Sequence, residues 1–217
     1  MQNEVLTILQ SVGAVLLNGH FVGTSGRHLE GYINKDALYP HTKFSSRIGE
    51  LFAHQYAEMD IDVVAAPAIG GTILSQWTAY HLSILKQKEV LSVYTEKDTG
   101  TTASAAESRQ IFRRGYESYV KGKNVLAIED LTTTGVSLQK LIEAVQKAGG
   151  NVIAASVMVN RDPDTVTEKT FGVPFIPLAE LRIRSFEEQE CPMCKNGMPV
   201  NISVGHGKKY LEKKSTP

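Results

Sequence analysis

Two near-continuous apolar runs with a helical stretch between them restrict the fold of this chain more than any other feature. The runs lie at 125–128 and 151–161. Between them, apolar side chains recur at the spacing of one helix face, at Leu138, Leu141, Ile142, Val145 and Ala148. Strands that are apolar on both faces and joined by a helix are typical of parallel sheets with helices on both sides. The sequence therefore predicts an α/β fold with a parallel sheet of about five strands.

The remaining elements follow from the same patterns. Three further segments carry the apolar pattern of strands: 61–68, 90–97 and 171–181. Three carry a helical pattern: the segments 1–17, 42–57 and 72–85. The last strand is predicted at a sheet edge, because its prolines cannot donate to a ladder. Residues 98–110 are small and polar without periodicity, which predicts a loop.

Charge and cysteine content narrow the class of protein. Lys plus Arg and Asp plus Glu both number 23, so no global field favours a nucleic acid or a membrane. No apolar run approaches the roughly 20 residues of a membrane span, and the N-terminus lacks the basic start of a signal peptide. Two cysteines, Cys191 and Cys194, are too few for a disulfide framework. We expect a cytoplasmic protein.

Two acidic residues stand where the run 125–128 ends, and a loop rich in hydroxyls follows them. In an open parallel sheet, ligands bind at the carboxyl ends of the strands, where Glu129 and Asp130 lie. The backbone N–H groups of 131–137 and the positive end of the next helix dipole favour a phosphate there. Gly135 lets the backbone approach closely. Hydroxyl donors are supplied by Thr132, Thr133, Thr134 and Ser137.

The acid pair and the phosphate loop must contact different parts of one ligand, because carboxylates repel phosphate. Glu129 and Asp130 suit ribose hydroxyls or a Mg²⁺ ion bound to them, so the predicted ligand is a sugar phosphate. The alternative is that Thr132 and Thr133 only cap a helix while the two acids are solvated charges at a strand end.

The stretch VLAIEDLTTTGVS resembles the phosphoribosyl-pyrophosphate (PRPP) motif of the type I phosphoribosyltransferases. The resemblance implies that family's fold. It also implies that Glu129 and Asp130 hold the ribose hydroxyls of PRPP, directly or through Mg²⁺. The residues implied to wrap the 5′-phosphate are Thr132, Thr133, Thr134, Gly135, Val136 and Ser137.

Segments between about residues 19 and 162 are similar to the orotate phosphoribosyltransferases in particular. The N-terminal pattern of that group is matched by Phe21, Ser25, Gly26, Arg27, Tyr32 and Asn34. The place of its pyrophosphate loop is occupied by Ala68, Ile69, Gly70 and Gly71. The start of its catalytic loop is matched by Lys97, Asp98 and Gly100. Arg161 stands where the group has an arginine that meets the orotate carboxylate.

The resemblance implies transfer of phosphoribose from PRPP to orotate, with Mg²⁺ as cofactor and a homodimer as the working form. Lys97, Asp98 and Asp130 would be catalytic, and Arg161, Lys35 and Thr133 would contact the base. A lysine can neutralise the leaving pyrophosphate, and a closing loop can exclude water. The apolar face of the first helix is compatible with a dimer. The implied divisions are an N-terminal helix and hood (1–41), a core (42–181) and an irregular tail (182–217).

Departures from the group leave two alternatives open. Thr24 replaces a lysine, and Tyr94 and Thr95 stand where a basic pair is usual, so some pyrophosphate contacts must differ. Lys35, or Arg109, Arg113 and Arg114, can compensate, although each arginine is also explained as surface charge. The base can be a purine or another pyrimidine, or the chain can be a PRPP-sensing regulator without turnover.

A C-x-x-C pair near the C-terminus has the spacing of metal ligands. Cys191 and Cys194 with His206 make a candidate zinc site, but structural zinc sites need four ligands. Cysteines of a second subunit can complete the site, or the thiols are simply reduced and structural. His20, His28 and His41 flank the N-terminal segment without enough context for a role.

Overall fold

The structure, a computed structural model, describes residues 1–23, 25–98 and 109–215. No helix in these three ranges combines the length and apolar character needed to cross a bilayer. The chain divides into two compact units. The larger unit comprises residues 1–5 and 41–181, and the smaller unit comprises residues 6–40 and 182–217.

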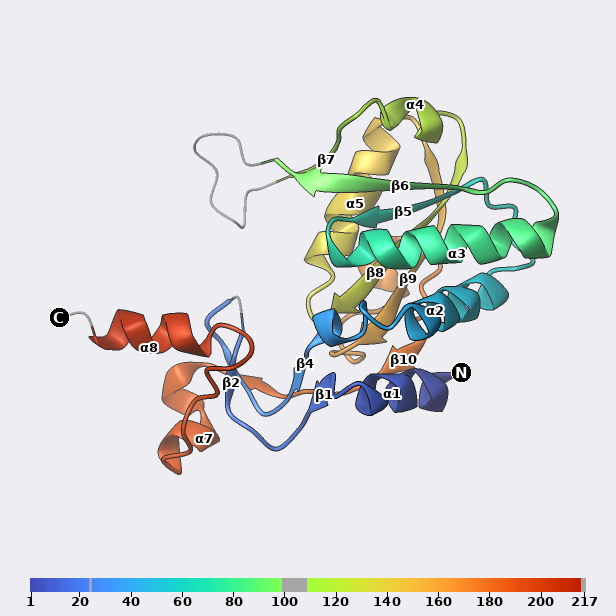
Figure 1. The fold of residues 1–217 in the computed structure, drawn as a ribbon. Helices are drawn as coiled ribbons and strands as arrows, with labels where there is room; N and C mark the ends of the chain where they lie inside the picture. The colour runs from blue at the N-terminus through green and yellow to red at the C-terminus, as the bar shows by residue number, and fades with distance from the viewer. Residues whose placement is uncertain (24, 99–108, 216–217) are drawn as a thin grey trace. The chain divides into compact units, whose positions relative to one another are not determined.

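A six-stranded sheet in the order β10-β9-β8-β5-β6-β7 forms the larger unit (Figure 1). Its strands are β5 (Val63–Pro67), β6 (Leu91–Lys97), β7 (Gln110–Phe112), β8 (Asn124–Thr132), β9 (Asn151–Asn160) and β10 (Ala179–Glu180). All neighbours pair in parallel except β6 and β7, which are antiparallel. The predicted five parallel strands are confirmed, and β10 lies at an edge as expected, although it comprises only two residues of the segment 171–181 and neither of its prolines. β7 is an additional strand that begins at the end of the predicted loop.

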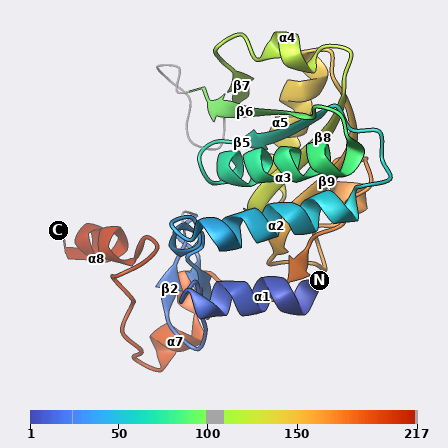
Figure 2. The same cartoon turned by 45° about the vertical axis from the view of Figure 1, so that its right-hand side comes forward.

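Helices cover both faces of this sheet. On one face lie α2 (Thr42–Gln55) and α3 (Gly70–Lys86), which run side by side (Figure 2). On the other lies α5 (Val136–Lys147), and the short α4 (Glu117–Val120) and α6 (Glu168–Phe171) add Val120 and Phe171 to the core cluster that α5 covers. A Cβ on Gly49 of α2 would lie 2.4 Å from Trp77 Cβ of α3, so a side chain at this position would force the two helices apart.

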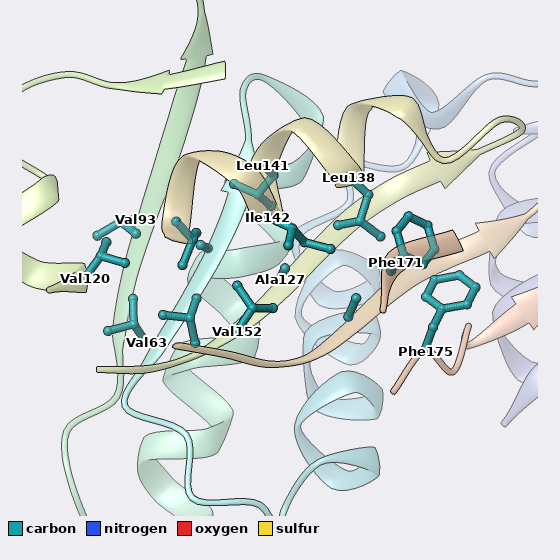
Figure 3. Packing of buried hydrophobic residues seen from close by; sticks show 14 of the residues in the cluster. Val63, Val93, Val120, Ala127, Leu138, Leu141, Ile142, Val152, Phe171 and Phe175 are labelled. Carbon is teal, nitrogen blue, oxygen red and sulfur yellow. The ribbon is translucent and has the colours of Figure 1, made fainter. Parts of the chain in front are cut away.

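The core explains why β5 is apolar throughout. All five of its residues are buried. Val63 and Ala65 join the cluster that includes Leu138 and Leu141 of α5 (Figure 3). Ala66 faces α3 on the opposite side of the sheet. A Cβ added to Gly71 of α3 would lie 2.9 Å from the Cβ of Ala66. A strand with a helix on each face has no solvated side, so it needs apolar residues at every position.

The smaller unit combines the N-terminal segment with the tail. The helix α1 (Gln2–Ser11) begins in the larger unit and ends before Gly13, which has a φ of +68°. A two-stranded sheet joins β1 (Val15–Leu16) to β4 (Tyr32–Ile33). A three-stranded antiparallel sheet joins β2 (Phe21–Val22), β3 (His28–Leu29) and the tail strand β11 (Ser185–Phe186). The first helix is therefore shorter than the 17 residues predicted to contain it.

The tail is not irregular, contrary to the sequence-based expectation. Besides β11 it contains η2 (Glu188–Glu190), α7 (Pro192–Lys195) and α8 (Gly207–Ser215); the N-terminal segment of this unit adds η1 (Lys35–Ala37). Elements of two to four residues are too short to show a period, and α8 is too polar to show an apolar stripe.

Candidate active site

The carboxyl ends of the parallel strands β5, β6, β8 and β9 lie at one edge of the sheet, and the predicted site residues of the larger unit gather there. Glu129 and Asp130 belong to β8 itself, which continues to Thr132 by pairing with Asn160 of β9. Asp130 is buried, and its Oδ1 accepts a hydrogen bond of 2.6 Å from the N–H of Leu131. The acid pair is thus held by a sheet ladder rather than by a loose strand end.

A tight turn connects the acid pair to α5. The N–H of Gly135 donates to Thr132 Oγ1 at 2.9 Å, and Gly135 has a φ of +76°, which favours glycine. The Thr133 hydroxyl is buried and has no hydrogen-bond partner among the described residues. The first N–H groups of α5, from Val136 onward, are the donors that a helix cannot satisfy itself. The turn therefore offers backbone and hydroxyl donors to an anion.

The segment from Ala68 to Gly71 forms the turn after β5. The N–H of Ala68 donates to the carbonyl of Thr95 at 2.8 Å, and the Ala68–Ile69 peptide bond is cis. Ile69 is exposed, and Gly70 begins α3. Gly71 has no room for a side chain because a Cβ would meet that of Ala66 at 2.9 Å. The predicted pyrophosphate loop is therefore a short turn beside the end of β6.

Lys97 ends β6 and lies beside this turn in an open pocket of about 570 Å³. The pocket is lined by Ala68, Ile69, Glu96, Lys97 and Arg113. The Arg113 guanidinium is 3.7 Å from Asp98 Oδ1 and 3.9 Å from Glu96 Oε2. Two cations and the Ala68–Ile69 turn thus share one pocket. Sequence reasoning left Arg113 undecided between surface charge and pyrophosphate contact, because its distance from Lys97 along the chain hides their proximity.

The other arginines considered for this role lie differently. Arg114 donates to Glu96 Oε1 at 3.0 Å, and its pKa is raised by the charge of Tyr94 and then by that of Glu96. Arg109 is exposed and lines a separate pocket against α5. Neither lines the pocket that contains Lys97.

The predicted base-binding residues are divided between the two units. Arg161 directly follows β9, and its N–H donates to the Thr132 carbonyl at 2.9 Å, so it adjoins the turn that contains Thr133. Lys35 is half-buried in η1 of the smaller unit. Arg27 donates to the Ser185 hydroxyl and carbonyl at 3.1 Å and pairs with Glu187, which ties β3 to the tail. Gly100 and Thr24 lie outside the described residues.

Comparison with known proteins decides the family. Residues 34–188, well over half of the chain, match the phosphoribosyl transferase domain. The chain belongs to the phosphoribosyltransferase family.

Relatives of this phosphoribosyltransferase are named orotate phosphoribosyltransferases. One from Thermoanaerobacter sp. is 35% identical, with the match covering 92% of this chain and 95% of the relative. One from Thermotoga maritima is 32% identical over 93% of this chain and 98% of its own. The crystal structure of the enzyme from Aeropyrum pernix superposes with a TM-score of 0.61 at 25% identity, covering 82% of this chain and 93% of that one. The type I phosphoribosyltransferase fold predicted from the motif is thereby confirmed.

A second cluster lies inside the smaller unit of this phosphoribosyltransferase and corrects the predicted zinc ligands. The ligand atoms of four side chains, His20, His28, Cys191 and Cys194, all lie within 4.8 Å of one another. His206 is not among them; it is exposed, and its N–H donates to the Val22 carbonyl. The sequence located the thiols but named the wrong histidine, because His206 is near them in the chain and the other two are not.

Proposed function

We propose that this phosphoribosyltransferase transfers the phosphoribosyl group of PRPP to orotate, giving orotidine 5′-monophosphate and pyrophosphate. The observation that carries the proposal is the gathering of an acid pair, a donor-rich turn and a two-cation pocket at one edge of the sheet. The relatives matched over almost the whole chain bear the corresponding name.

PRPP would bind along this edge in two parts. Its 5′-phosphate would accept hydrogen bonds from the N–H groups at the start of α5 and from the hydroxyls of Thr133, Thr134 and Ser137. The buried Thr133 hydroxyl has no other partner among the described residues, so an anion in the turn would satisfy it. Glu129 and Asp130 would accept hydrogen bonds from the ribose hydroxyls.

The donor set at the acid pair fits Mg²⁺, which binds carboxylates and substrate phosphates through oxygen. Glu129 and Asp130 would hold the ion through the ribose hydroxyls of PRPP, and Asp130 is fixed in β8 by the ladder and by its bond to Leu131. When bound, Mg²⁺ would supply positive charge next to the pyrophosphate.

Departure of pyrophosphate breaks the bond between C1′ of the ribose and the diphosphate oxygen. A ring nitrogen of orotate bonds to C1′ and gives up its proton, which the departing pyrophosphate can accept. Negative charge develops on the leaving oxygen, and Lys97 and Arg113 lie in the pocket beside the Ala68–Ile69 turn to stabilise it. Asp98, 3.7 Å from Arg113, would orient the guanidinium. Arg113 would thus supply some of the positive charge at the pyrophosphate that is lost where Thr24 and Tyr94 replace basic residues.

Orotate differs from other bases by its carboxylate. A guanidinium fork suits a carboxylate, and Arg161 lies at the end of β9, where its N–H donates to the Thr132 carbonyl at the end of β8. The contact of Lys35, in η1 of the smaller unit, with the base stays a prediction. A different base remains the second candidate, because the fold is shared with an adenine phosphoribosyltransferase from Thermoanaerobacter pseudethanolicus at a TM-score of 0.54.

Steady-state kinetics with PRPP, Mg²⁺ and a panel of bases tests the proposal, with pyrophosphate release as the readout. Orotate should give the highest kcat/KM. Lys97→Ala should lower kcat about 10²–10³-fold while the Kd for PRPP changes only a few-fold, because its charge acts mainly on the transition state. Lys88→Ala is the matched control, since Lys88 pairs with Asp60 and Asp62. Full PRPP binding with no turnover on any base would instead identify a regulator.

Arg161→Met separates orotate from the alternative bases. The KM for orotate should rise about 10–100-fold, which is the effect expected from losing one hydrogen-bonded pair of charges. The Kd for PRPP should stay unchanged. Arg114→Met is the control, because Arg114 is paired with Glu96. An unchanged orotate KM in Arg161→Met would refute the carboxylate contact.

A homodimer in the cytoplasm belongs to the same proposal. The first helix does not support the dimer as expected, since its apolar residues Val5, Ile8 and Leu9 are buried within the chain. The α3 residues Tyr80 and Ile84 are more than half exposed and lie one helical turn apart, which suits a subunit contact. Light scattering on the purified protein should give twice the chain mass, and Ile84→Asp should halve it.

A further inference from the structure

Four potential metal ligands converge in the smaller unit from two distant parts of the chain. His20 precedes β2 and His28 begins β3, while Cys191 and Cys194 lie at the start of α7. His28 and Cys191 are completely buried, and His20 is 3% exposed. Side chains of this chemistry seldom share a buried space unless something binds them together.

The spacing of the ligand atoms matches a tetrahedral ion. Zinc bonds of about 2.0–2.1 Å to nitrogen and 2.3 Å to sulfur place neighbouring N and S ligands about 3.6 Å apart. Cys194 Sγ lies 3.3 Å from His28 Nδ1 and 3.7 Å from His20 Nε2, and Cys191 Sγ lies 3.8 Å from the same His20 nitrogen. The two ring nitrogens are 2.7 Å apart, so the rings must separate by about 0.7 Å to hold an ion between them.

Contacts around the cluster orient its ligands. His20 Nδ1 lies 2.8 Å from the Met198 carbonyl and must donate to it, so the lone pair is on Nε2, which faces the thiols. The N–H of Cys194 reaches Cys191 Sγ at 3.5 Å, within range of an N–H···S bond that holds the sulfur in position. A hydrogen bond on the remote nitrogen is the usual support of a metal-bound histidine.

We propose that His20, His28, Cys191 and Cys194 bind one Zn²⁺ ion as a structural Cys₂His₂ site. Two thiolates balance the charge of the ion, and a buried set of two sulfur and two nitrogen ligands favours zinc over magnesium or calcium. With four protein ligands no position is open for substrate water, so the role is not catalytic.

The ion would cross-link the N-terminal segment to the tail within the smaller unit. The three strands that join these segments, β2, β3 and β11, have only two residues each. Sheets of this size supply little stability, and a metal whose ligands come from both segments stabilises the folded state by its binding free energy. This proposal is independent of the base that the active site uses.

Metal analysis of the reduced full-length protein tests the site. Mass spectrometry of the metal content should find about one zinc per chain after excess metal is removed. Replacement by Co²⁺ should give a thiolate-to-cobalt charge-transfer band and the intense visible bands of a tetrahedral ion. Both measurements use the unaltered chain, so they do not depend on whether variants fold.

Variants identify the ligands. Cys194→Ser and His28→Asn should lower the zinc content or affinity at least about tenfold, because loss of a residue that only supports a metal ligand already costs about that much. The matched control is His206→Asn, which should keep its zinc because His206 is outside the cluster. Reduced wild-type protein that retains no zinc after incubation with the ion would overturn the proposal. So would equal zinc loss in His206→Asn, or a cobalt spectrum without the thiolate band.

Discussion

Gly135 lies in the turn between the acid pair and α5, and the structure predicts how much stability a side chain at this position would cost. Its φ of +76° is left-handed, which costs alanine about 1 kcal/mol. An added Cβ would also lie 3.0 Å from Thr170 Cγ2 and 3.1 Å from Phe171 Cζ. Those contacts are tighter than ordinary van der Waals distances, so Thr170 and Phe171 must move by a few tenths of an ångström, and overpacking of this kind costs about 1–3 kcal/mol. Gly135→Ala should therefore destabilise the larger unit by about 2–4 kcal/mol.

Gly122 is the matched control for the contact term. It has nearly the same φ, +70°, but no atom of the described residues lies within 4 Å of the position that its Cβ would take. Gly122→Ala should therefore cost only about 1 kcal/mol. For a chain of this length each kcal/mol lowers Tm by about 2–4 °C, so the expected losses are about 2–4 °C for Gly122→Ala and about 4–16 °C for Gly135→Ala.

Trp77 fluorescence is the appropriate assay, because Trp77 is the only tryptophan of the chain and lies in α3 of the larger unit. Thermal and urea unfolding of both variants should be followed by this signal. Equal losses for Gly135→Ala and Gly122→Ala would refute the contact argument and leave only the backbone cost. Weaker PRPP binding should accompany the larger loss, because a shift of the backbone away from this φ would disturb the turn that the Gly135 N–H closes on Thr132.

Two further substitutions test the packing and the ion pairs of α2. Gly49→Ala should cost at least about 2 kcal/mol in urea unfolding, because its Cβ would lie 2.7 Å from the backbone carbonyl carbon of Trp77; a loss below about 0.5 kcal/mol would contradict this. Arg47 donates to Glu4 at 2.7 Å and to Glu50 at 2.8 Å, and these hydrogen bonds lower the pKa of both carboxyls below 4.5. A carboxyl whose pKa is lower in the folded state adds stability above pH 4.5, and this stability is lost as the pH falls through the folded-state pKa. Because solvent screens both ion pairs, Arg47→Met should lower the free energy of unfolding by about 0.5–1 kcal/mol at pH 7. Near pH 3 the same substitution should cost almost nothing. A cost that is equal at both pH values would contradict the ion-pair explanation.

The sheet was predictable because its signals are local. Val63, Ala65 and their neighbours are apolar at every position, which by itself indicates a strand covered on both faces. The end of β8 was not predictable in this way. Apolar character stops at Ile128, but the strand continues to Thr132 because β9 supplies the partner for Leu131 and Thr132. Pairing between strands decides such ends, and a single run of residues does not contain that information.

The active site shows the same division between local and distant information. Glu129, Asp130 and the hydroxyls after them are consecutive, so the motif alone placed them together. Arg113 joins Lys97 only because β7 returns antiparallel to β6 and pairs Lys97 with Gln110. A three-residue strand after an aperiodic segment gives too weak a pattern to predict that return.

The cluster of His20, His28, Cys191 and Cys194 also depends on distant information. The spacing of the two cysteines correctly indicated metal ligands, but the histidine nearest to them in the chain is not part of the cluster. Cys191 and Cys194 have the spacing of metal ligands, and His206 is the closest histidine in the chain. The partners instead come from His20 and His28, which antiparallel pairing of β3 with β11 brings into the unit formed by the tail. A metal ion with four protein ligands stabilises the fold most when it joins segments that are far apart in sequence. Closing a long loop removes more entropy from the unfolded state than closing a short one. When a pair of cysteines has no second pair nearby in the sequence, the strand that precedes the cysteines is therefore the best guide. The missing metal ligands should be sought in the segment that pairs with this strand.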